Sequence, residues 1–267
     1  MPGQPATCSP AFLKAFPFVR DQLVPAYDQA GSRAFAYCQG SMVEGLSDSS
    51  DVDIICVWTE RAPDQSQRPP LPTDPTPAPR VWPRQENFHV DGQEFGVAHY
   101  LLSEWKDWLA EMEQGQGCDG WPTPVIAAHG LLHGVLVHDP ANAGAALKTR
   151  LHRFPPRLRT QPGLRARIAL PDYIEVLVAA ERTKDGLLFH GELVKILRLL
   201  WIGWFSAREL YWPLEKRLTT RLRIMGREDL ASLEDAIWAA GPDISVRLSA
   251  FLTLAQALLA EVPVGDK

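Results

Sequence analysis

Two aspartates, Asp51 and Asp53, stand at the start of a short apolar run that ends at Trp58. The length and β-branched content of this run predict a buried strand. Because alternate residues of a strand project from one face, we expect both carboxylates to point together and Val52 to point away. At about 6 Å they would repel by about 3 kcal/mol at an effective dielectric near 20. We therefore expect a cation there, and carboxylate oxygens suit magnesium that also binds substrate phosphates.

A turn that favours anions precedes this strand. Gly40 and Ser41 follow a second predicted strand over residues 34–39. Glycine permits a tight bend, in which bare backbone N–H groups and a hydroxyl can face a phosphate. Anion donors in the turn and paired carboxylates on the next strand are the parts needed for metal-assisted phosphoryl or nucleotidyl transfer.

The Gly-Ser turn, a spacer of eight residues and the segment Ser50–Asp53 together resemble the signature of polymerase-beta-type nucleotidyltransferases. That superfamily includes the aminoglycoside nucleotidyltransferases and the bacterial minimal nucleotidyltransferases. The resemblance implies a transferase that moves a nucleoside monophosphate from a nucleoside triphosphate such as ATP to a hydroxyl, with release of pyrophosphate. It also implies that Gly40, Ser41 and Ser50 contact the nucleotide, and that Asp51 and Asp53 bind magnesium or manganese.

Members of this superfamily carry a third carboxylate on a neighbouring strand. In this sequence that position falls at or near Gly96, which has no side chain. Glu94, two residues earlier and so on the same face of the expected strand, is the candidate third metal ligand. His99 falls on the opposite face, where we expect a packed or solvent-exposed histidine and not a metal ligand. If Glu94 points away, the alternative is a catalytically weakened nucleotide-binding or toxin–antitoxin-type regulatory protein.

The resemblance further implies a general base on a second domain. Residues 174–181 resemble the helix that carries this glutamate in aminoglycoside nucleotidyltransferases, so Glu181 is the candidate. A base has to reach the proton of the acceptor hydroxyl, as a residue on a second domain facing the metal pair can do. Lys184 is a candidate contact of the triphosphate. An ordinary exposed helix residue is the alternative for each.

The surrounding pattern predicts an α+β fold with a nucleotidyltransferase domain over residues 1–147, a basic linker over 148–170 and a helical bundle over 171–267. In the first domain we expect a mixed sheet with flanking helices. It includes a hairpin turning at Asp91-Gly92, whose second arm lies beside the aspartate strand. The proline-rich stretch 61–86 predicts an extended loop. The bundle resembles, in its position, the HEPN domain that partners minimal nucleotidyltransferases; its expected helices cover residues 173–189, 192–208, 213–225, 229–239 and 245–261.

The composition is typical of a soluble globular protein, with 46% hydrophobic and 22% charged residues. A net charge of −5 argues against a protein dedicated to coating nucleic acid. We expect neither a signal peptide nor a membrane span, and the four scattered cysteines indicate reduced thiols in a cytoplasmic protein.

Two further questions stay open at the level of sequence. The apolar run 199–205 indicates either a central bundle helix or the face of a homodimer. The acceptor is a small hydroxylated molecule, an RNA or a protein. An acidic cleft would favour a cationic aminoglycoside, and a basic stretch facing the same cleft would favour RNA.

Overall fold

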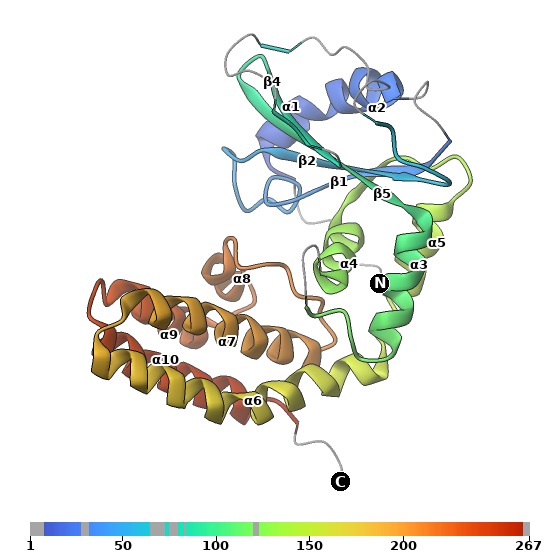
Figure 1. Cartoon of the computed structure of the whole chain (residues 1–267). Coiled ribbons are helices and arrows are strands. Elements are labelled where there is room, and N and C mark those ends of the chain that lie inside the picture. The colour runs from blue at the N-terminus through green and yellow to red at the C-terminus, as the bar shows by residue number, and fades with distance from the viewer. Residues whose placement is uncertain are drawn as a thin grey trace. The chain divides into compact units, whose positions relative to one another are not determined.

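The computed structural model describes residues 8–27, 32–64, 73–74, 80–82, 84–119 and 123–263. The chain divides into two compact units: the first is Met1–Leu109 with Gly130–Arg153, and the second is Ala110–His129 with Phe154–Lys267. The sheet belongs to the first unit, and the long helices belong to the second: α6 Pro156–Thr183, α7 Gly186–Ala207 and α10 Ile244–Ala260 (Figure 1). This division differs from the sequential three-part order expected from the sequence, because residues 110–129 belong to the second unit.

Six strands form a mixed sheet in the order β3-β4-β5-β2-β1-β6. Strands β2 and β5 run parallel, and all other neighbours run antiparallel. The α+β fold class, the two strands around the Gly-Ser turn and the position of β5 beside the aspartate strand are confirmed. The strands are β1 Arg33–Gln39, β2 Val52–Trp58, β3 Arg80–Trp82, β4 Gln85–Val90, β5 Gln93–Leu101 and β6 Val135–His138.

The hairpin between β4 and β5 turns where the sequence predicts it. Asp91 and Gly92 both have positive φ, 51° and 76°, as a type I′ turn requires. The Asp74 carboxylate accepts hydrogen bonds from both backbone N–H groups, at 3.1 and 2.8 Å. Strand β3 lies inside the stretch 61–86 expected as a loop; it is an edge strand, where nearby prolines are tolerated. Residues 65–72, 75–79 and 83 of that stretch lie outside the described residues.

One face of the sheet is covered by the N-terminal helical stretch, and we call it the helix-covered face. It carries Cys38, Ile54 and Phe95, among others, and all are buried. The stretch consists of α1 Pro10–Phe18, the π-helical turn η1 Val19–Leu23 and α2 Val24–Ala26. Its π-helical turn lies between Pro17 and Pro25, which have no N–H to donate to the helical ladder, and Val24 N–H bonds Val19 O five residues back.

A chain of buried polar groups crosses the helix-covered face. Trp58 Nε1 donates to His99 Nδ1 at 3.2 Å, and His99 Nε2 lies 3.4 Å from Glu86 Oε1, which also accepts from the Tyr27 hydroxyl. Because an indole N–H can only donate, His99 Nδ1 has to accept, so its Nε2 carries the proton toward Glu86. Of the packed and the solvent-exposed histidine that the sequence leaves open, the structure has the packed one, since His99 is fully buried.

His99→Leu should lower the free energy of unfolding by about 1–3 kcal/mol, because it leaves the buried Trp58 N–H without an acceptor and removes a partner of Glu86. Urea unfolding followed by circular dichroism measures this loss. His89→Leu is the matched control, since His89 is partly exposed on the other face of the sheet. Equal losses of unfolding free energy in both variants would contradict this account of the buried hydrogen bonds between Trp58, His99 and Glu86.

The other face of the sheet carries Gln39, Asp53, Gly96 and Asn87, and we call it the site face. Over β1 this face is covered: the Tyr37 ring meets Trp105 of α3 Leu102–Glu113 edge to face, with centroids 6.5 Å apart. Helix α5 Ala143–Leu151 also approaches β1 closely, because a Cβ on its buried Gly144 would lie 3.0 Å from the Phe35 ring.

The second unit contains five helices that follow residue 153, and it shares α4 Pro124–His133 with the first unit. The five are α6 Pro156–Thr183, α7 Gly186–Ala207, α8 Leu218–Ile224, α9 Glu228–Ala239 and α10 Ile244–Ala260. The expectation of one helix over 173–189 is wrong. Lys184 adopts a left-handed conformation with φ 56°, and the Asp185 side chain caps α7 by accepting the Leu188 N–H at 3.0 Å.

Helices α6 and α7 approach each other at two glycines. A Cβ on Gly203 of α7 would lie 2.9 Å from the Cα of Gly163 in α6. The aromatic run of α7 from Leu200 to Phe205 is buried. This burial supports a central helix of its unit, as one of the two sequence interpretations expects; the homodimer stays a prediction. Among the described residues, no helix is long and apolar enough to cross a membrane.

The basic stretch expected as a linker is mainly helical, since it includes the end of α5 and the first half of α6. Four of its arginines are engaged within the second unit. Arg157 donates to the Gln114 side chain, Arg159 pairs with Glu209 at 3.0 Å, Arg165 donates to Gly115 O at 3.0 Å, and Arg167 donates to Val262 O at 2.6 Å. These side chains hold α6 to its neighbours, so this part of the stretch is structural.

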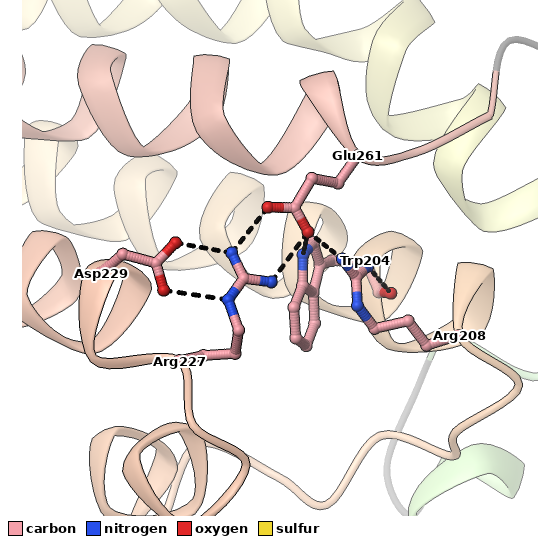
Figure 2. Close-up of polar contacts among 5 residues, drawn as sticks. All are labelled: Trp204, Arg208, Arg227, Asp229 and Glu261. Atoms are coloured by element: carbon pink, nitrogen blue, oxygen red, sulfur yellow. Dashed lines mark hydrogen bonds and ion pairs between the residues drawn. The ribbon is translucent and has the colours of Figure 1, made fainter.

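A cluster of charged and aromatic side chains joins three segments of the second unit (Figure 2). Glu261 accepts from Arg227 at 2.6 and 2.8 Å, from Arg208, and from Trp204 Nε1 at 3.1 Å. The Arg208 guanidinium lies 3.7 Å from the centroid of the Trp204 ring, a cation–π contact. Arg227 also bonds Asp229 and thereby holds the pKa of that carboxyl at about 2. The cluster fastens the end of α10 to α7 and to the start of α9.

Candidate functional site

Asp53 lies between two glycines on the site face. The β-sheet register aligns Gln39, Asp53, Gly96 and Asn87 across four neighbouring strands. A Cβ on Gly40, which has φ 99°, would lie 2.8 Å from Asp53 Oδ2, and a Cβ on Gly96 would lie 3.3 Å from Asp53 Oδ1. The carboxylate therefore fills the space that a side chain at Gly40 would occupy, and it borders the space over Gly96.

The turn after β1 folds back on itself beside this carboxylate. Glu44 N–H donates to Gly40 O at 3.1 Å, and Leu46 N–H donates to Ser41 O at 2.7 Å. Met42 and Val43 are buried in the helix-covered core, which anchors the turn. Within the described part of the chain, Ser41 Oγ is buried without a hydrogen-bond partner. Since a buried unpaired hydroxyl is unfavourable, it marks a position where a ligand oxygen would be stabilising.

Asp51 is held in place from its own side of the site. Ser50 Oγ donates to Asp51 Oδ1 at 2.7 Å, and Gln93 Nε2 donates to Ser50 O at 3.0 Å. Val52 is buried on the helix-covered face, as the alternation along the strand requires. Both aspartates are partly exposed. Two carboxylates of this kind fit a hard cation that takes its remaining oxygens from substrate phosphates or water.

Glu94, the expected third ligand, belongs to a different set of contacts. Its Oε1 accepts from Asn87 Nδ2 and from the Arg80 guanidinium, both at 3.3 Å. Among the residues that the structure describes, no three His, Cys, Asp or Glu side chains are placed to hold a metal ion together. Metal binding by Asp51 and Asp53 stays a prediction, and Glu94 as a metal ligand stays a prediction without a supporting contact.

Two side chains border the space over Gly96: Asp53 lies nearest, and Asn87 is the next nearest. Its Nδ2 would be 3.6 Å from a Cβ at position 96. The sequence interpretation did not include this residue, although the hairpin provides the signal. Counting outward from the Asp91-Gly92 turn pairs Val90 with Gln93 and, three steps further, Asn87 with Gly96.

Glu181 and Lys184 lie in the second unit, whereas the aspartates lie in the first. Glu181 Oε1 accepts from Lys184 Nζ at 2.7 Å and from Ser245 Oγ at 2.6 Å. These hydrogen bonds lower the pKa of the Glu181 carboxyl, which makes it a weaker base. The roles expected of both residues therefore stay predictions, and these contacts tie the end of α6 to the start of α10.

No family model matches the chain, and no curated protein matches it. Among solved structures, the chain is similar to a nucleotidyltransferase-like protein from Exiguobacterium sibiricum. The two share 11% sequence identity with a TM-score of 0.42, and the match covers 93% of this chain and 74% of that one. Any assignment of function therefore depends on the geometry of the site face.

Proposed function

We propose that the chain is a nucleotidyltransferase that transfers a nucleoside monophosphate from a nucleoside triphosphate to a hydroxyl. One observation carries this proposal. Asp53 lies between Gly40 and Gly96, directly beside a glycine-serine turn, and Asp51 immediately precedes the same strand. An anion-binding turn next to paired carboxylates is suited to a magnesium–triphosphate complex.

Each group has a definite task in this proposal. Asp51 and Asp53 would hold magnesium or manganese, which when bound neutralises charge on the phosphates. The Gly40-Ser41 turn would bind phosphate oxygens through backbone N–H groups and the unpaired Ser41 hydroxyl. Ser50 would act by fixing the orientation of the Asp51 carboxylate, to which it donates. Glu181 as general base and Lys184 as a nucleotide contact are separate proposals on which this one does not depend.

A second function is favoured by one specific observation. Position 96 has no carboxylate, and the described residues supply no three-ligand metal group. A protein that binds a nucleotide and responds to it without transferring it would need only the turn and the paired aspartates. Such a regulatory protein would bind magnesium–ATP but would not label any acceptor.

The decisive experiment incubates the full chain with labelled nucleoside triphosphates, magnesium and a cell extract separated into small-molecule, RNA and protein fractions. We expect label in one fraction, and at least tenfold weaker calorimetric affinity for magnesium–ATP in Asp51→Asn. Binding without labelling would support the regulatory alternative. Wild-type protein that neither binds nor labels would refute both functions.

A further inference from the structure

The side chain of Asn87 is oriented by its neighbours on the site face. Its Nδ2 donates to Glu94 Oε1 at 3.3 Å, and its Oδ1 accepts from Gln85 Nε2 at 3.3 Å. Glu94 also accepts from Arg80, so it is held as an acceptor. A carboxylate on one side and an amide donor on the other leave one favourable orientation of the Asn87 amide, with Nδ2 toward Glu94.

This orientation determines what Asn87 offers to a ligand at Asp53. A Cβ at position 96 would be 3.6 Å from Asn87 Nδ2 and 3.3 Å from Asp53 Oδ1, so both atoms border the same space over Gly96. An amide nitrogen has two protons, and Glu94 uses one of them. The second proton is available for an oxygen atom placed over Gly96.

We propose that Asn87 binds an oxygen of the nucleotide triphosphate over Gly96, and that Glu94 is a positioning residue that orients the Asn87 amide. This inference rests on the proposed function and adds a donor where a third carboxylate was expected. An anionic phosphate oxygen matches an N–H donor, and the absence of a side chain at Gly96 leaves it room. Phosphate held between the aspartate pair and Asn87 would be recognised by its charge and shape, independently of the base.

The test measures by calorimetry how tightly the full chain binds two probes. One is the magnesium complex of a non-hydrolysable ATP analogue, and the other is magnesium tripolyphosphate. Asn87→Ala should weaken both by about tenfold to a hundredfold, the effect expected for losing a hydrogen bond to a charged group. Asn87→Asp should weaken both further, because a carboxylate replaces the donor beside Asp53. Asn142→Asp makes the same change at an exposed site in the first unit and should leave binding unchanged.

Glu94→Gln separates a positioning role from metal ligation. It should weaken binding of both probes severalfold while leaving manganese affinity in the absence of nucleotide unchanged. Tighter metal and nucleotide binding in Asn87→Asp would overturn the inference, since position 87 would then act as a ligand of the cation. Unchanged affinity in Asn87→Ala, with binding still lost in Asp51→Asn, would refute the role of Asn87 and leave the proposed function standing. A wild-type protein that binds neither probe would refute both.

Discussion

Asp53→Asn is expected to reduce nucleotide transfer by about a thousandfold, the upper range for removing one group that stabilises developing charge. Asparagine has the same shape, so it fits between Gly40 and Gly96, where any larger change would collide with the turn. What is lost is one of two negative charges that offset a bound cation. The measurement is label transfer at saturating nucleotide, together with thermal unfolding to show that the fold is intact.

Asp48→Asn is the matched control, because Asp48 is exposed in the loop between the same two strands. We expect it to keep full activity and unchanged stability. A large loss in both variants would mean that loop charge, and not the pair on the site face, governs transfer. Full activity in Asp53→Asn would exclude the proposed mechanism.

Gly203→Leu is expected to unfold the second unit. A Cβ at this position would lie 2.9 Å from the Gly163 Cα and 3.2 Å from its backbone nitrogen, so the collision is with main chain and no side-chain rotation relieves it. Helix α6 cannot simply retreat, since Gly163 is itself packed against Val262. Overpacking of a core usually costs about 1–3 kcal/mol, and a backbone collision between two long helices should exceed that range.

Gly191→Leu provides the comparison within the same helix. Nothing lies within 4 Å of a Cβ at Gly191, so leucine there should be neutral or slightly stabilising through its better helix propensity. Circular dichroism at 222 nm during heating measures both variants. The packing account fails if Gly203→Leu melts within a few degrees of the wild type.

Local patterns were sufficient to predict the elements around the site. The apolar run after Asp53 and the Asp91-Gly92 turn specify two strands and a hairpin, because strand periodicity and turn conformation are properties of neighbouring residues. The contact between Asp53 and the Gly40 turn follows from the same short segment. The sequence interpretation missed Asn87 because its proposed role depends on the register across the sheet. An asparagine in a strand does not by itself indicate a phosphate donor.

Two other predictions failed for a different reason: tertiary contacts overrode the local sequence pattern. The sequence predicted a basic linker over residues 148–170, but four of its arginines each find a partner within the second unit. The break between α6 and α7 was missed because apolar spacing continues across it. Only the left-handed Lys184 and the cap at Asp185 end one helix and begin the next.

The order in which the chain visits its two units has a consequence for how the protein is made and how it can be divided. The chain leaves the first unit after Leu109, returns at Gly130 and departs again after Arg153. Neither unit is a contiguous piece, so no single cut releases either one whole. During synthesis, the sheet cannot acquire β6 until the ribosome has already delivered part of the helical half.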